Sequence, residues 1–342
     1  MLSNPRDWVV LASALVLGAS AFYVLLPRFI RALVRALLAL RYDFRVRGRE
    51  NVPRTGPTLL AANHQSWIDG FVLAALSPRP GKAMVNAAFV NLPVFRQLAV
   101  RAGIIPTPFS GPRAIRSALE GCRAVLAEGG CVGIFPEGQI SRNGLPGPFY
   151  RGVEVILRGR ADVAVVPVAL DNLWGSLFSR SGGKFLWKRP VGLRRTIHVV
   201  FGPPVPPPVT AFALRQALLE TLVHAYELRT RPGTLPETLD LSLPRWEHPT
   251  LGLLTASAAD IHYDDIHQIG QKPGSVGHPV PGVAVRVVDE TGAPLSPQVE
   301  GRIEALRAGH PGWADTGRLG SMDPDGFVRL ADVGPRVVTA PT

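Results

Sequence analysis

The sequence predicts an α/β fold in which helices flank a sheet, with an N-terminal membrane helix before it and a small β-rich domain after it. Three short apolar runs, at residues 58–62, 131–133 and 165–170, have the length and composition of buried strands. Helical patterns lie between them, an apolar one at residues 70–76 and an amphipathic one at 112–128. Strands and helices therefore follow one another along the chain, as in an α/β domain.

The remaining elements of this domain follow from local patterns. Residues 43–47 alternate between polar and apolar side chains, which predicts an edge strand, and residues 83–85 and 196–201 predict two further strands. Helices are expected at residues 92–102 and 210–230.

The length of 342 residues is enough for two domains, or for one domain with appendages. We expect four segments: an N-terminal membrane anchor at residues 1–41, the main α/β domain at 42–231, a linker rich in proline and leucine at 232–248, and the β-rich domain at 249–342.

The N-terminal anchor combines an apolar run with a basic helix. Residues 8–26 carry no charge, and 19 residues are about the length that spans a hydrocarbon core. Seven arginines follow between Arg28 and Arg49, so the positive-inside rule places the main domain on the cytoplasmic side. Two alternatives stay open: a signal peptide cleaved near residues 19–21, and an interfacial hairpin that does not cross the bilayer.

The charge of the chain favours a membrane partner. The net charge is +11, yet residues 241–342 carry 8 Lys and Arg against 12 Asp and Glu, so the first 240 residues hold the whole excess of positive charge. A basic surface suits nucleic acid or an anionic membrane. No nucleic-acid motif is present, and the apolar N-terminus favours the membrane. Cys122 and Cys131 fall in a predicted helix and strand, which indicates reduced core residues.

The first candidate catalytic pair is His64 and Asp69, on the turn between the strand at 58–62 and the helix at 70–76. Five residues of continuous helix would point the two side chains apart. They meet only if His64 lies on the turn and Asp69 on the first helical turn. Asp69 would then accept a hydrogen bond from one imidazole nitrogen and leave the other free as a general base. The alternative is a helix-capping aspartate beside an ordinary histidine.

A second stretch, Phe135-Pro136-Glu137-Gly138, follows the apolar run at residues 131–133 and also stands at a predicted strand end. Glu137 is expected to bind hydroxyl groups of an acceptor substrate or to hold Arg142. Arg142 and Arg151 are candidate anion ligands, because a guanidinium fork matches phosphate oxygens. The alternative for both arginines is a solvated surface charge.

These stretches together resemble the glycerolipid acyltransferases of the lysophosphatidate acyltransferase type. The resemblance rests on an NHxxxxD motif beginning at Asn63, an FPEG block beginning at Phe135 and a later VPV strand, which stand here in the order of that family. The chain is most similar to the acyltransferase half of bifunctional 2-acylglycerophosphoethanolamine acyltransferase/acyl-ACP synthetase proteins. The similarity extends over residues 44–207.

The resemblance implies catalysis by His64 and Asp69. It implies substrate contacts from a second set of residues: Asn63, Ser66, Phe135, Pro136, Glu137, Gly138, Arg142 and Arg151. It implies acyl-CoA or acyl-ACP as co-substrate, with no other cofactor and no metal at His64 and Asp69. One departure concerns the acceptor. The family places an arginine soon after the strand that here ends at Pro106, but this sequence has none before Arg113.

The last hundred residues resemble part of the adenylate-forming (AMP-binding) enzymes, through short motifs between residues 274 and 327. The phosphate-binding loop and the C-terminal lid of that family have no counterpart in this sequence, and Arg318 stands where the ribose-binding aspartate is expected. We therefore expect a shortened domain that does not activate acids.

The function expected from the sequence is acyl transfer from a thioester to the free hydroxyl of a lysophospholipid at the bacterial inner membrane, with the catalytic domain facing the cytoplasm. The first candidate acceptor is 1-acyl-sn-glycerol-3-phosphate, which gives phosphatidate. The alternative acceptor is 2-acylglycerophosphoethanolamine, in phospholipid remodelling. An acyl-activating ligase and a non-catalytic membrane adaptor are the competing classes. The backbone N–H groups of Gly138 and its neighbours are expected to stabilise the oxyanion.

Overall fold

The structure, a computed structural model, describes residues 28–86, 104–107, 111–183, 194–230, 233, 235–263 and 266–331. The predicted membrane helix at residues 8–26 and the predicted helix at 92–102 lie outside the described residues. Within the described ranges, no helix combines the length and the apolar character needed to cross a bilayer.

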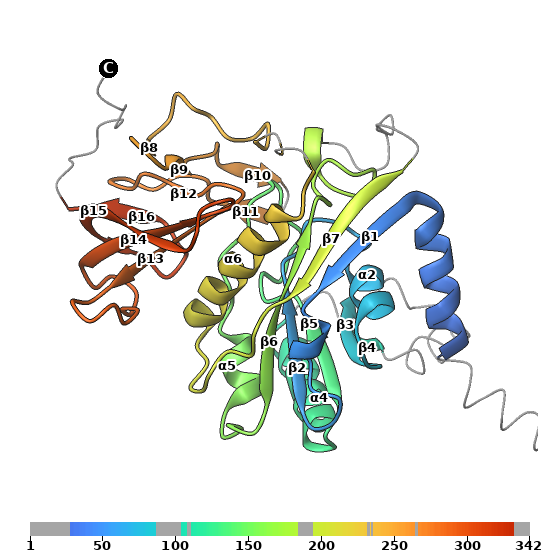
Figure 1. The fold of residues 1–342 in the computed structure, drawn as a ribbon. Coiled ribbons are helices and arrows are strands. Elements are labelled where there is room, and N and C mark those ends of the chain that lie inside the picture. The colour runs from blue at the N-terminus through green and yellow to red at the C-terminus, as the bar shows by residue number, and fades with distance from the viewer. Residues whose placement is uncertain are drawn as a thin grey trace, which may run out of the picture.

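A seven-stranded sheet forms the centre of the main domain (Figure 1). In spatial order its strands are β1 (Tyr42–Arg47), β7 (Arg195–Phe201), β6 (Ala164–Asp171), β2 (Thr58–Ala62), β5 (Cys131–Ile134), β3 (Lys82–Asn86) and β4 (Ile104–Thr107). Neighbouring strands are parallel except β6 and β7, so β1 and β7 run against the other five. The strands predicted from the apolar runs are confirmed, and β1 is the edge strand that its alternating pattern predicts.

Helices cover this sheet on both faces. They are α2 (Asp69–Leu76), α4 (Pro112–Ala127), α5 (Gly152–Leu157) and α6 (Ala211–Glu227), together with a helix over residues 28–41 and the short 3-10 helices η1 (Arg49–Asn51) and η3 (Ser181–Gly183). Helix α4 has its proline in the first turn, where the missing N–H costs no hydrogen bond.

Two apolar cores lie on opposite faces of the sheet because side chains alternate along each strand. On one face, Leu60 and Val166 belong to a cluster with Val72 of α2. On the other face, their neighbours Leu59 and Val165 belong to a cluster with residues of α4, α5 and α6. Strand β2 is buried along its whole length, so packing fixes the position of the turn that begins at residue 63.

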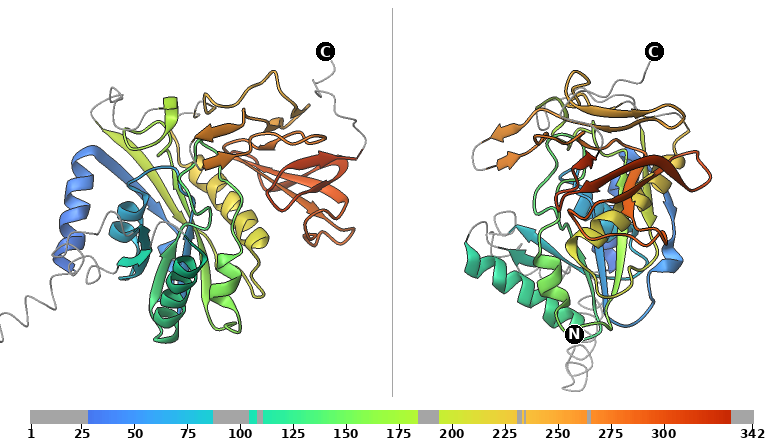
Figure 2. Two further views of the ribbon diagram at one scale, coloured as in Figure 1. Left: turned by 180° about the vertical axis from the view of Figure 1, so that it is seen from behind. Right: turned by 90° about the vertical axis from the view of Figure 1, so that its left-hand side faces the viewer.

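The C-terminal part is rich in β-structure, as predicted (Figure 2). It contains a three-stranded sheet of β12 (His278–Pro279), β9 (Gly252–Ala256) and β8 (Arg245–His248), and a hairpin of β10 (Ile261–Tyr263) and β11 (Ile266–Gln268). A four-stranded sheet follows, with β13 (Val283–Val288), β14 (Gly301–Arg307), β15 (Trp313–Met322) and β16 (Val328–Leu330). Strand β8 lies inside the segment 232–248 that was expected to be a linker.

Helix α6 packs against both parts of the molecule, and Figure 1 shows it between the main sheet and the C-terminal strands. Leu214 and Leu218 belong to the core of the main domain. Leu219 and Val223 pack with Ala284 of β13 in a separate cluster. A helix with two buried faces thus connects the C-terminal strands to the main domain.

Candidate active site

The candidate site lies at the carboxyl ends of β2 and β5, two parallel neighbours whose ends meet at one edge of the sheet. Asn63 is the first residue after β2. Its Nδ2 donates to the Leu170 carbonyl at 3.0 Å, and its Oδ1 accepts from the Leu170 N–H at 2.8 Å. The buried carboxamide of Asn63 thus connects the turn to β6 and positions His64, and the substrate contact expected of Asn63 stays a prediction.

His64 and Asp69 are in direct contact, as their spacing predicts. His64 lies on the turn, Asp69 begins α2, and the His64 Nδ1 is 2.9 Å from Asp69 Oδ2. The same oxygen accepts from the backbone N–H groups of Gln65 at 2.6 Å and Ser66 at 2.8 Å. Three contacts at one oxygen fix the carboxylate, and this arrangement favours the His64 tautomer that donates from Nδ1 and leaves Nε2 as the base.

Burial separates the environments of these two side chains. The Asp69 side chain is completely buried, whereas 19% of the His64 side chain is exposed. Burial raises the pKa of Asp69, and the contacts with His64 and with the Ser66 and Gln65 N–H groups oppose this rise. Among the described residues, Asp69 Oδ1 has no hydrogen-bond partner. The hydrogen bonds that stabilise the charged form therefore all act on Oδ2, the oxygen in contact with the imidazole.

Glu137 connects two segments of the backbone. Its Oε1 accepts from the His64 N–H and its Oε2 from the Gly147 N–H, both at 2.8 Å. Burial raises the pKa of Glu137 to about 7, against the opposing effect of those two N–H groups. Both oxygens of Glu137 thus hold the turn, and the expectation that Glu137 binds hydroxyls of the acceptor or holds Arg142 stays a prediction.

Phe135, Pro136 and Gly138 make different contacts. Phe135 contacts His64, whereas Pro136 and Gly138 form backbone hydrogen bonds with other residues. The Phe135 ring stacks on the His64 imidazole, with centroids 4.2 Å apart and planes 19° apart. The Pro136 carbonyl accepts from the Tyr150 N–H at 2.9 Å. Gly138 has a positive φ of 64°, and its N–H donates to the Phe135 carbonyl at 3.0 Å. That N–H is used within the turn, so the oxyanion role expected for it has no support.

Comparison with known proteins agrees with this arrangement. Residues 43–171, which contain both motifs, match the family model described as Acyltransferase. This segment is therefore similar to the acyltransferases. The match covers β1 to β6 and includes His64, Asp69 and Glu137.

Several proteins similar to this part of the chain carry the same name. The chloroplastic 1-acyl-sn-glycerol-3-phosphate acyltransferase LPAT1 of Arabidopsis thaliana is 30% identical over 130 residues, which are 38% of this chain and 36% of that protein. A 1-acyl-sn-glycerol-3-phosphate acyltransferase of Chlamydomonas reinhardtii is 29% identical over 247 residues, which are 64% of this chain and 73% of that protein. The chain thus spans little more than a third of the plant relative.

Two solved structures are also similar. The 1-acyl-sn-glycerophosphate (LPA) acyltransferase PlsC from Thermotoga maritima aligns with 66% of this chain and 90% of its own, with 20% identity and a TM-score of 0.49. MatB from Rhodopseudomonas palustris aligns with 90% of this chain and 72% of its own, with 16% identity and a TM-score of 0.22.

The other predicted site residues of the main domain lie around this centre or outside it. Ser66 is buried and holds Asp69 through its N–H. The Arg142 N–H donates to Gln268 Oε1 at 2.7 Å. Arg151 is exposed and pairs with Glu154 at 2.9 Å, so its side chain belongs to the surface at the start of α5.

Three residues of the site were missed by sequence reasoning. Gln65 binds Asp69 through its N–H, and its Nε2 donates to the Gly144 carbonyl at 3.1 Å. Arg215 donates from Nε to the Gly147 carbonyl at 3.1 Å. Gln268 of β11 donates from Nε2 to Asn143 Oδ1 at 2.7 Å. The only sequence signal was an arginine among apolar residues of the helix at 211–227.

The loop that follows the FPEG block joins these contacts to the histidine. The Ser141 N–H donates to the His64 carbonyl at 2.7 Å, and the Ser141 hydroxyl donates to the Leu145 carbonyl at 2.8 Å. His64 is therefore held through its side chain by Asp69, through its N–H by Glu137 and through its carbonyl by Ser141. A histidine held in this way suits general acid–base catalysis.

Proposed function

We propose that the protein transfers an acyl group from a thioester, acyl-CoA or acyl-ACP, to the free hydroxyl of a lysophospholipid. The observation that carries the proposal is the His64–Asp69 pair, with a 2.9 Å contact and a carboxylate fixed by two further N–H donors. The names of the relatives support 1-acyl-sn-glycerol-3-phosphate as the acceptor.

The mechanism follows from the hydrogen bonds of the dyad. Nε2 of His64 takes the proton of the acceptor hydroxyl while Nδ1 stays hydrogen-bonded to Asp69. The carboxylate of Asp69 stabilises the imidazolium that forms. The acceptor oxygen attacks the thioester carbonyl and forms a tetrahedral intermediate. Its collapse forms the ester and breaks the C–S bond, and the imidazolium returns its proton to the thiolate that leaves. No covalent enzyme intermediate is needed.

The helix over residues 28–41 supports a membrane-bound enzyme. The helix over residues 28–41 packs Val34 and Leu38 against the sheet core and leaves several large apolar side chains exposed. These exposed side chains are Phe29, Leu33, Leu37 and Leu40. A basic helix with an exposed apolar side suits the surface of an anionic membrane. We place the acyltransferase domain at the cytoplasmic face of the bacterial inner membrane.

We assign no acyl-activating step to the C-terminal strands. Arg318 lies on β15 at the position where adenylate-forming enzymes are expected to bind ribose through an aspartate. An arginine supplies no acceptor for ribose hydroxyls. ATP–pyrophosphate exchange with fatty acids of several lengths should therefore give no signal above that of a heat-denatured sample.

The proposal is tested with full-length protein in detergent micelles. We would offer lysophosphatidate and 2-acylglycerophosphoethanolamine, each with acyl-CoA and with acyl-ACP, and measure the diacyl product. We expect phosphatidate to form fastest. If only the ethanolamine lipid gives product, the proposed reaction stands but the proposed acceptor is wrong. Absence of product with every pair would overturn the proposed function.

A further inference from the structure

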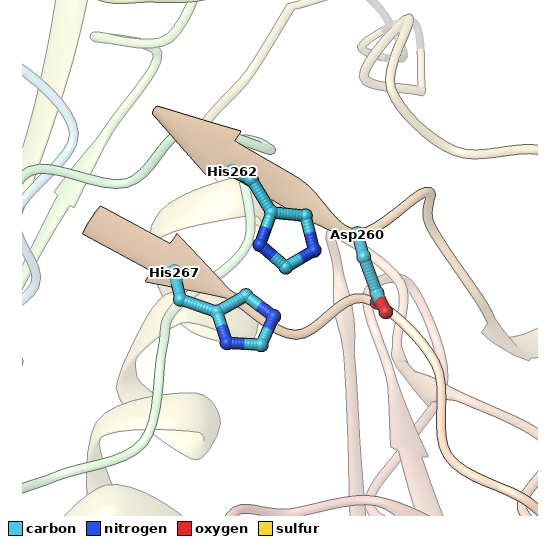
Figure 3. Close-up of side chains that lie close together, drawn as sticks. All are labelled: Asp260, His262 and His267. Atoms are coloured by element: carbon cyan, nitrogen blue, oxygen red, sulfur yellow. The ribbon is translucent and has the colours of Figure 1, made fainter. Parts of the chain in front are cut away.

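The hairpin of β10 and β11 brings together three side chains that are typical metal ligands: Asp260, His262 and His267 (Figure 3). All three residues are exposed, and they lie outside the acyltransferase domain. One ligand atom from each side chain lies within 4.8 Å of the corresponding atoms of the other two.

The strand geometry explains why these side chains share one face. His262 and His267 are direct partners across the antiparallel pair, and partners across a ladder project to the same side. Their rings are stacked, with centroids 4.0 Å apart and planes 22° apart. Asp260 is two residues before His262, which puts it on the same side of an extended chain.

Asp260 is held in place by the loop that follows β11. Its Oδ1 accepts from the Gly270 N–H at 2.8 Å and from the Gln271 N–H at 3.3 Å. These bonds orient the carboxylate through one oxygen and leave the second oxygen outside them. A fixed carboxylate beside two imidazoles has a smaller entropy cost of binding an ion than three freely moving side chains.

We propose that Asp260, His262 and His267 bind one divalent transition-metal ion of the zinc type. Imidazole nitrogen and carboxylate oxygen are the ligands that zinc accepts at distances of about 2.0–2.2 Å, and three protein ligands leave a position for water. Tetrahedral binding at that distance needs ligand atoms about 3.3 Å apart. Rotation of the two exposed imidazoles about their side-chain bonds closes the difference from 4.8 Å.

The test is calorimetric titration of ZnCl2 into the full-length protein, prepared without a polyhistidine tag and freed of metal. We expect one ion per chain. His262→Ala and His267→Ala should each raise the dissociation constant at least about tenfold. Asp260→Asn keeps an oxygen for the Gly270 N–H but loses the charge, so it should also weaken binding. His310→Ala, another exposed histidine of the C-terminal part, is the matched control and should bind as the wild type does.

A second measurement separates binding from folding. In EDTA, the melting temperatures of the wild type and the His262→Ala/His267→Ala variant should agree, because both side chains are exposed. ZnCl2 should raise the melting temperature of the wild type alone, and MgCl2 should raise neither. Equal zinc binding by the wild type and the double variant would show an adventitious ion only and would overturn the proposal. So would a wild type that binds no zinc.

Discussion

At the scale of single residues, Asp69 is the group on which the proposed chemistry depends. Asparagine at this position keeps one oxygen for the Gln65 and Ser66 N–H groups and for the proton on His64 Nδ1. The lost part is the negative charge beside the imidazolium. A hydrogen bond to a charged group contributes about 1.5–3 kcal/mol, so Asp69→Asn should lower kcat roughly 10- to 100-fold.

Asp69→Ala is the variant with which the stability of Asp69→Asn is compared. Alanine also leaves two buried N–H groups without an acceptor, at a cost of about 1–3 kcal/mol each in stability. We therefore expect Asp69→Asn to unfold in urea close to the wild type and Asp69→Ala to unfold at a clearly lower concentration. Equal kcat for the wild type and Asp69→Asn would contradict the role of the charge.

Glu137 makes the stability of the fold depend on pH. Burial raises its pKa to about 7, compared with 4.5 for an ordinary glutamate. Between these values the folded protein keeps a proton that the unfolded chain has lost, so its free energy of unfolding falls as pH rises from about 4.5 to about 7. The total change is about 3 kcal/mol.

The measurement is urea unfolding of the wild type and Glu137→Gln at pH 5 and at pH 8. Glutamine does not titrate, so this part of the pH dependence should disappear in the variant. The variant should also be less stable at pH 5, because its amide nitrogen accepts no hydrogen bond from the His64 or Gly147 N–H. Identical pH dependence in the two proteins would contradict the assignment.

At the scale of secondary-structure elements, helix α6 holds the loop at residues 146–147 through the side chain of one arginine. Arg215 is 1% exposed, and its Nε and Nη2 donate to the carbonyls of Gly147 and Pro146 at 3.1 and 3.3 Å. Leucine would leave both carbonyls without these donors, and each loss costs about 1–3 kcal/mol. We expect Arg215→Leu to lower the free energy of unfolding by about 2–6 kcal/mol.

The matched control for this variant is Arg45→Leu. Arg45 is 67% exposed on the edge strand and pairs with Asp43 at 3.3 Å. Exposed pairs contribute little, so this change should alter stability by less than about 1 kcal/mol in the same urea titration. A loss of stability for Arg215→Leu no greater than for Arg45→Leu would show that the buried guanidinium does not hold the loop.

Local patterns predicted the elements that carry the dyad. The apolar run at β2 and the first residues of α2 fix where His64 and Asp69 stand, and their contact follows from a spacing of five residues. The contacts of Glu137 with Gly147 and of Gln268 with Asn143 could not be predicted in this way. They join segments that are 10 and 125 residues apart, and their partners are backbone groups and amides without a sequence pattern.

The buried Arg215 of α6 is another contact that local sequence patterns do not predict. An arginine in a helix normally lies at the surface, and the sequence does not show that C-terminal strands cover the second face of this helix. The C-terminal β-structure was predicted from motif resemblance, but the packing of α6 against β13 is a tertiary feature. The sequence therefore predicted the contact between His64 and Asp69 better than the residues that hold the pair in place.

At the scale of the whole molecule, the helix over residues 28–41 is the surface that we expect to meet the membrane. Leu33 and Leu37 are 47% and 57% exposed, and they lie one turn apart on the same side. Burial of a leucine contributes about 1.5–3 kcal/mol, so Leu33→Asp/Leu37→Asp should weaken vesicle binding at least about tenfold.

Cosedimentation with vesicles that contain an anionic lipid measures this effect. Leu241→Asp/Leu319→Asp is the control, because these leucines are 46% and 49% exposed in the C-terminal part. The control variant should bind as the wild type does. An equal loss of binding in both double variants would show that the helix has no special part in membrane contact.

The most direct test of the account compares acyl transfer by the wild type, His64→Ala and His224→Ala, each as full-length protein in detergent with lysophosphatidate and acyl-CoA or acyl-ACP. His224 is an exposed histidine on α6 and serves as the control. General acid–base catalysis contributes roughly 10²–10⁴-fold, so His64→Ala should lose at least about 99% of the rate while the other two proteins remain active. Transfer by His64→Ala at the rate of the wild type would contradict the account.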